Sequence, residues 1–156
     1  MTPADALPGA HVPRIVPLLN PIVGRLARLG VPLGPNVLLT VRGRSTGLPR
    51  TFPVALMRAG GRLLVQSPYG EPNWVRNLRA DPRATLVRGG RRDEVEAVEL
   101  EPEVGGPLVR EAADPYLRRP LVSAFARLFI PLGREATLAD WVEHARHHPV
   151  FELQLR

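Results

Sequence analysis

The residues with the clearest chemical potential lie between Leu38 and Thr51, in the segment LLTVRGRSTGLPRT. An apolar run ends in a turn bounded by Gly43 and Gly47, and a second segment follows, which predicts strand, turn and strand. Hydrogen-bond donors surround the bend, at Arg44, Ser45, Thr46 and Arg50. Such a turn suits a phosphate or a carboxylate. The same residue types also build plain structural turns, and the residues alone do not choose between the two interpretations.

A second polar segment follows the strand expected at Arg62 to Gln66. A turn of Ser67, Pro68, Tyr69 and Gly70 leads into a short helix, which leads into another strand. Trp74 and Leu78 are four residues apart, so they share one face of that helix with Asn77.

The order of these motifs resembles that of the deazaflavin-dependent nitroreductase family. The shared features are the Gly-Arg turn with its Pro-Arg, the Ser-x-x-Gly turn and the W-x-x-NL helix, and the similarity extends over about Asn20 to Gly90. The resemblance implies an α+β fold, an antiparallel split β-barrel of the FMN-binding type with flanking N-terminal and C-terminal helices. It also implies coenzyme F420 as cofactor and hydride transfer to an electron-poor acceptor such as a quinone, a nitro compound or an enone.

The resemblance also implies roles for individual residues. By this resemblance, the residues that bind the cofactor's phosphate and polyglutamate tail are Arg44, Ser45, Thr46, Gly47, Pro49 and Arg50. The residues that contact the ring system are Ser67, Pro68, Tyr69 and Gly70. The helix that follows contributes Trp74, Asn77 and Leu78 to the cofactor site. Family members often have Lys where Ser45 stands, so one charge-assisted contact is missing here. Trp74 has an alternative interpretation as a core residue.

Two phenols are candidates for giving a proton to the reduced substrate, Tyr69 and Tyr116. A phenol is a donor at neutral pH and tolerates an apolar pocket. Either residue serves equally well as simple packing.

Composition narrows the classes of function. All 21 basic residues are Arg, and the net charge of +6 with a pI near 11.2 indicates acidic partners. Nucleic acid is disfavoured because the arginines are scattered and aromatic residues make up only 5%. The absence of Cys excludes disulfides and thiolate chemistry. No signal peptide or membrane-spanning run is recognised, so we expect a cytoplasmic protein. The family resemblance implies a small-molecule hydride acceptor as its partner.

One structural domain is expected from the length of 156 residues. Residues 1–35 read as a leader and a basic amphipathic helix at Pro21 to Leu29, which packs on the barrel or makes peripheral contact with an anionic membrane. Residues 36–156 read as the cofactor-binding split barrel. Its strands are expected at Val37 to Arg42, Arg50 to Arg58, Arg62 to Gln66, Ala84 to Arg88, Asp93 to Glu101 and Val150 to Leu155. Short connections between most of them favour an antiparallel meander.

The C-terminal third is expected to be largely helical. Glu103 to Asp114 predicts a weak helix interrupted by two glycines and a proline, and Tyr116 to Pro131 predicts a helix that covers a pocket. Thr137 to His147 predicts a capped helix. His144, His147 and His148 have a spacing that suits a metal, but their place in the last turn and the lack of an acidic partner favour a site without metal.

Two alternatives remain open at this point. The first is an FMN- or haem-binding oxidoreductase on the same barrel, because a flavin phosphate also requires a cradle. The second is a protein that binds deazaflavin or a fatty acid without turnover. The oligomeric state is not predicted.

Overall fold

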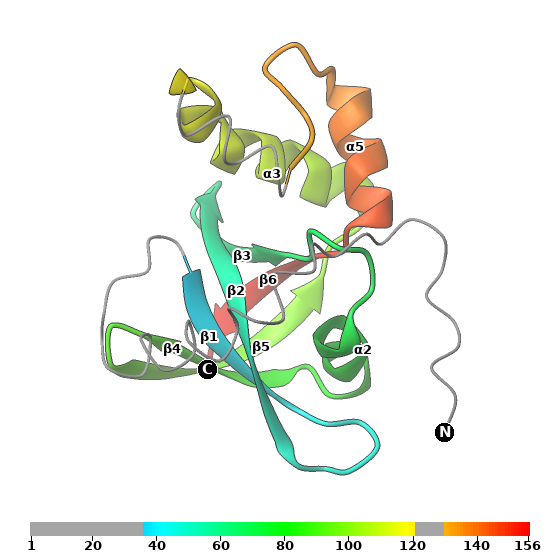
Figure 1. Cartoon of the computed structure of the whole chain (residues 1–156). Helices are drawn as coiled ribbons and strands as arrows, with labels where there is room; N and C mark the ends of the chain where they lie inside the picture. Colours follow the sequence, from blue (N-terminus) through cyan, green and yellow to red (C-terminus); the bar gives the residue numbers. More distant parts are fainter. Residues whose placement is uncertain (1–35, 121–129) are drawn as a thin grey trace.

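Six strands form a closed antiparallel barrel in the computed structural model, which describes residues 36–120 and 130–156 (Figure 1). Neighbouring strands around the barrel follow the order β1-β2-β3-β6-β5-β4. The strands are β1 (Asn36–Arg42), β2 (Pro49–Ala59), β3 (Arg62–Gln66), β4 (Arg83–Arg88), β5 (Arg91–Glu99) and β6 (Val150–Leu155). The predicted α+β class and the antiparallel split barrel are confirmed, and the observed strand bounds lie within about two residues of those expected.

Strand β2 is long enough to serve two neighbours. Its first part pairs with β1, where Arg50 lies opposite Val41, and its last part pairs with β3, where Ala59 lies opposite Arg62. Successive side chains of a strand point to opposite faces of the sheet, so buried and exposed residues alternate. In β5, for example, Val95 and Ala97 are buried while Glu94 and Glu96, which alternate with them, are exposed, as predicted.

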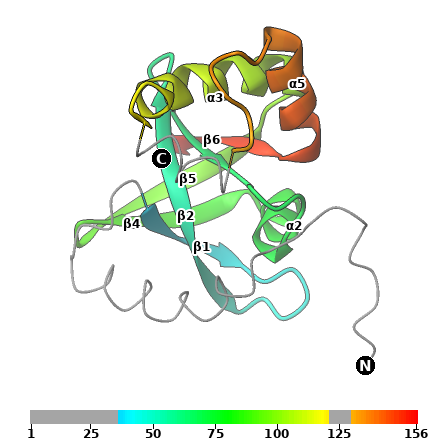
Figure 2. The ribbon, with the colours of Figure 1, turned by 45° about the horizontal axis from the view of Figure 1, so that its top comes forward.

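Three helices complete the described fold, α2 (Asn73–Ala80), α3 (Pro102–Leu117) and α5 (Leu138–His147). Helices α3 and α5 pack together over one end of the barrel, and α2 lies at its side (Figures 1 and 2). The apolar core accordingly has two parts. One fills the barrel and includes Leu39, Val65 and Leu86, and the other lies between the barrel wall and the α3–α5 pair and includes Val109 and Trp141.

Helix α3 corrects the prediction of a weak, interrupted helix at Glu103 to Asp114. The helix runs without a break through Gly105, Gly106 and Pro107. The two glycines are contact points, because a Cβ on Gly105 would lie 3.1 Å from Val150, and one on Gly106 would lie 2.8 Å from the backbone of α5. Burial of the helix against its neighbours therefore outweighs the poor intrinsic propensity of these residues.

Helix α5 begins as predicted. Thr137 accepts a hydrogen bond from the Asp140 N–H, and the Asp140 carboxylate accepts one from the Thr137 N–H, which makes a capping box.

Other predicted segments lie partly or wholly outside the described residues. The amphipathic helix at Pro21 to Leu29 and residues 121–129 of the second predicted helix are among them. No helix within the described ranges is long and apolar enough to cross a bilayer.

Candidate functional site

The β1–β2 hairpin closes as a tight turn, as the sequence predicts. The Gly43 N–H donates to the Leu48 carbonyl at 2.8 Å, and the Gly47 N–H donates to the Gly43 carbonyl at 2.7 Å. Gly47 has a φ of +69°, a left-handed conformation that favours glycine. At Gly43 a Cβ would lie 3.0 Å from the Thr46 hydroxyl, so this position leaves little room for a side chain. Both glycines are therefore required by the turn itself.

Arg44 braces the hairpin against α2. Its guanidinium Nη1 donates to Asn77 Oδ1 at 2.9 Å and to Asn73 Oδ1 at 3.4 Å, and its backbone N–H donates to Asn77 Oδ1 at 3.2 Å. Asn77 is only 4% exposed, so these bonds satisfy a buried amide oxygen. Much of the donor capacity of Arg44 is thus committed inside the protein.

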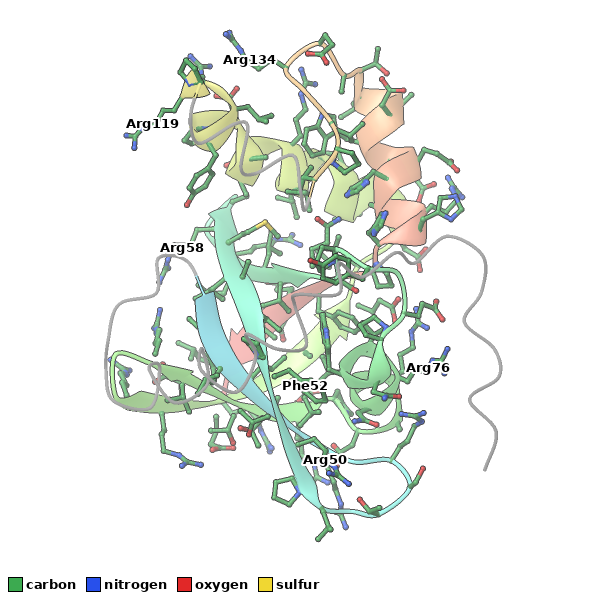
Figure 3. All side chains as sticks on the ribbon, viewed as in Figure 1. Arg50, Phe52, Arg58, Arg76, Arg119 and Arg134 are labelled. Atoms are coloured by element: carbon green, nitrogen blue, oxygen red, sulfur yellow. The ribbon has the colours of Figure 1, made fainter. Side chains whose placement is uncertain are left out.

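Arg50 has the opposite surroundings. It lies at the hairpin end of β2 and is exposed, and its side chain makes no ion pair or hydrogen bond within the described ranges (Figure 3). Arg58 lies near the other end of the same strand and is equally without a charged partner there (Figure 3). Arg76, on the outer side of α2, is a further exposed cation of this kind (Figure 3). Of the two arginines predicted to hold phosphate, Arg50 is therefore the one whose guanidinium is available.

The turn from Ser67 to Gly70 is anchored at its first residue. The Ser67 N–H donates to the Pro149 carbonyl at 3.0 Å, and the Ser67 carbonyl lies 3.2 Å from Nδ1 of His148. Gly70, with a φ of +74°, completes the turn, and α2 starts at Asn73. The Ser67 hydroxyl is fully buried and has no hydrogen-bond partner among residues 36–120 and 130–156. An unpaired buried hydroxyl costs about 1–3 kcal/mol, which a water or a cofactor group that reached it would recover.

The two candidate phenols are not brought together. Tyr69 is half-buried in the turn before α2, and burial raises the pKa of its phenol above the ordinary value. The phenol is therefore protonated at neutral pH. Tyr116 is 44% exposed near the C-terminal end of α3, and both views place that end of the helix away from α2 (Figures 1 and 2).

The predicted face of α2 is the face that the barrel buries. Trp74 and Leu78 are 6% and 2% exposed, and the Trp74 ring lies 5.9 Å from that of Phe151. These two side chains therefore belong to the barrel core, which is the alternative that the sequence left open for Trp74. Their packing holds α2 against the barrel, and Asn77 holds the hairpin by accepting hydrogen bonds from Arg44.

The three C-terminal histidines do not converge on one point. His144 and His148 stack with ring centroids 4.1 Å apart, while His147 contacts Glu143 at 2.9 Å. Within the described ranges no group of three potential ligands is placed to hold a metal. The contact of His148 with Ser67 was missed by the sequence reasoning. Helical spacing predicted that the three histidines lie close together, but no local pattern indicates that His148 contacts Ser67, 81 residues away.

A shallow groove of about 410 Å³ lies on the outer side of the hairpin. Of the predicted residues it contains Gly47 and Pro49. Its cations are Arg42 from β1, Arg83 from β4 and Arg156, which follows β6. Asp81 neutralises Arg83 at 2.9 Å. Ser45 and Thr46 are exposed at the hairpin tip.

These residues fit an anionic cofactor with a hydrogen-bonding ring. The hairpin provides an uncommitted guanidinium on a glycine-shaped turn, and the turn at Ser67 provides an orphaned hydroxyl and a protonated phenol. Both segments flank α2, because Arg44 ties the hairpin to it and Gly70 leads into it.

Solved structures with the same fold bind different groups. An F420-H2 dependent reductase, FDR-A, matches with a TM-score of 0.50 at 22% identity, covering 77% of this chain and 94% of that one. A haem-binding protein from Mycobacterium smegmatis matches at 0.51 and 16% identity, covering 83% and 50% of the two chains. An FAD-binding protein from Mesorhizobium loti matches at 0.50 and 16% identity, covering 83% and 87%. At these identities the matches establish the fold alone.

The family model decides what the fold leaves open. The model of the F420H(2)-dependent quinone reductase family matches residues 21–114, which include the hairpin, the turn at Ser67 and α2. More than half of the chain is matched, and the segments with the chemically suitable residues lie inside the match. The chain therefore belongs to the F420H(2)-dependent quinone reductase family and is an oxidoreductase that uses reduced F420.

Proposed function

We propose that this protein transfers a hydride from reduced F420 to an electron-poor organic acceptor, with a quinone as the first candidate and nitro compounds and enones as the others. The observation that supports it best is the pairing of an uncommitted Arg50 on the hairpin with the polar turn at Ser67, both held at α2, inside the family match. When bound, the reduced deazaflavin supplies the hydride from its own ring carbon.

The hairpin binds the anionic part of the cofactor. Arg50 donates to the phosphate, and the hydroxyls of Ser45 and Thr46 add neutral donors at the tip. Arg44 is a positioning residue, because its bonds to Asn77 and Asn73 hold the hairpin at α2. Where relatives have Lys, Ser45 carries no charge, so Arg50 contributes a larger share of the electrostatic attraction.

The turn from Ser67 to Gly70 lies along the ring system. Its backbone amides and the Ser67 hydroxyl orient the ring, and the Tyr69 phenol gives a proton to the substrate oxygen or nitrogen that gains charge as the hydride arrives. Because burial keeps the phenol protonated, the donor is in the correct state at neutral pH. Tyr116 remains a candidate donor from the sequence, and its distance from α2 makes Tyr69 the better one.

The first experiment is a fluorescence titration of the protein with F420, with FMN and haemin in parallel. We expect micromolar or tighter binding of F420 and weaker binding of the other two. Arg50→Ala should raise the dissociation constant of F420 by at least about tenfold, the loss of one charge-assisted bond. Arg58→Ala is the matched control, because it removes the same charge from the other end of β2. Equal effects of the two variants would contradict the assignment of Arg50.

Turnover is tested with reduced F420 and a panel of quinones, nitroaromatics and enones. Tyr69→Phe should lower kcat by about 100-fold with little change in F420 affinity, the size of a general-acid contribution. Tyr116→Phe serves as the control. Tight F420 binding without oxidation of the reduced form by any acceptor would show a binding protein, and preference for FMN or haemin would show the alternative flavin or haem enzyme.

A further inference from the structure

The corner between α5 and β6, at His148 and Pro149, is hydrogen-bonded to Gln66 and Ser67, where the Ser67 turn begins. Within it, the Gln66 amide Nε2 donates to the His148 carbonyl at 3.3 Å, and the Ser67 N–H donates to the Pro149 carbonyl. Gln66 also pairs with Val150 at the end of the β3–β6 ladder. Hydrogen bonds therefore hold the backbone on both sides of this corner, and the imidazole of His148 adds a side-chain contact to them.

The His148 ring holds the Ser67 carbonyl. A carbonyl oxygen only accepts, so Nδ1 of His148 carries the hydrogen in this 3.2 Å contact. Together with the Ser67 N–H, this bond engages both backbone polar groups of the residue that starts the turn. The orientation of the next peptide, which leads to Pro68 and Tyr69, is set by where that carbonyl points.

His144 supports the ring from behind. The two imidazoles are stacked, with planes 27° apart, and the Trp141 ring meets His144 edge-on at 6.4 Å. His144 is 8% exposed, and its Nε2 has no hydrogen-bond partner among residues 36–120 and 130–156. His144 therefore contributes through the shape of its ring and not through Nε2. Its stacked ring restricts the rotation of His148.

We propose that His148, supported by His144, is a positioning residue for the cofactor turn. It fixes the Ser67 carbonyl and so presents the turn and the Tyr69 phenol to the cofactor ring, an inference that rests on the function proposed above. His148 itself contacts neither cofactor nor substrate. The side-chain bond from His148 to Ser67, between residues 81 positions apart, thus adds to the two other hydrogen bonds that join the end of α5 to the turn.

The test compares His148→Asn with His148→Leu. The Asn amide nitrogen stands where Nδ1 stands and restores the donor, whereas Leu has a similar shape without one. We expect His148→Leu to raise the F420 dissociation constant roughly tenfold, the loss of one well-placed hydrogen bond and the order it imposes. His148→Asn should recover most of that affinity. The kcat for acceptor reduction should fall more in the Leu variant than in the Asn variant.

A stability control separates positioning from folding. Val109→Ala removes volume from the α3–α5 core, far along the chain from the turn, and should lower Tm without a change in F420 affinity. Circular dichroism melts of all the variants show which are folded at the assay temperature. If His148→Leu binds F420 as wild type does, or if Val109→Ala weakens binding as much, the positioning role is wrong. If the wild-type protein does not bind F420, the proposed function fails first.

Discussion

Acidification below about pH 6.5 should destabilise this protein through His144. Burial lowers the pKa of His144 to about 4 from an ordinary value of 6.5, with smaller contributions from the neighbouring charges of His148 and His147. Burial also lowers the pKa of His148, although its bond to the Ser67 carbonyl opposes the change. The folded protein thus binds fewer protons than the unfolded chain between pH 6.5 and 4.

The sign and size follow from linkage. A base with a lowered folded pKa contributes stability that is fully present above pH 6.5 and is lost as the pH falls toward 4. From pH 8 to pH 5 the two values for His144 give a loss of about 2 kcal/mol in the free energy of unfolding, which is roughly 4–8 °C in Tm for a chain of this size. Two charged rings at 4.1 Å would repel by about 4 kcal/mol at an effective dielectric constant of 20, so the pair does not charge together.

The assay is a urea melt at pH 8, 6.5 and 5 for the wild type and for His144→Phe. Phe keeps a ring against His148 and Trp141 but does not titrate, so its loss of stability at pH 5 should be smaller by about 2 kcal/mol. His147→Gln is the control, because the His147 ring is 71% exposed, and it should keep most of the wild-type dependence. Equal slopes for the wild type and His144→Phe would refute the reasoning.

Three further predictions concern stability and order. Gly106→Ala should lower the free energy of unfolding by about 2 kcal/mol in a urea melt, because its Cβ would meet the α5 backbone at 2.8 Å, and an unchanged midpoint would contradict that close packing. Thr137→Ala should cost about 1 kcal/mol by removing the capping box, measured in the same way, whereas Thr51→Ala, at an exposed position of β2, loses only its bond to Thr40 and should cost less. Arg44→Ala should leave Asn77 less well satisfied, cost about 1 kcal/mol and speed hydrogen exchange of the hairpin amides, and protection as in the wild type would show that the brace is unimportant.

Patterns of short range allowed much of the fold to be predicted. The strands followed from alternation and glycine-rich turns, the shared face of Trp74 and Leu78 on α2 from their four-residue spacing, and the start of α5 from the Thr137 cap. The hairpin turn and its hydrogen-bond donors could be predicted because they too lie in one short segment. The family resemblance supplied the cofactor, and residues 21–114 confirm the family.

Contacts between distant residues decided the rest. The tether from Arg44 to Asn77 spans 33 positions and the bond from His148 to Ser67 spans 81, and no local pattern encodes either. Packing also reversed a local rule at Gly105 and Gly106, where the absence of side chains lets α3 approach its neighbours and remain a helix. The sequence by itself determined the elements and the residue types available for chemistry. Only the tertiary structure decided which arginine is committed and that Tyr116 lies away from the turn that contains Tyr69, because both depend on which surfaces the barrel brings together.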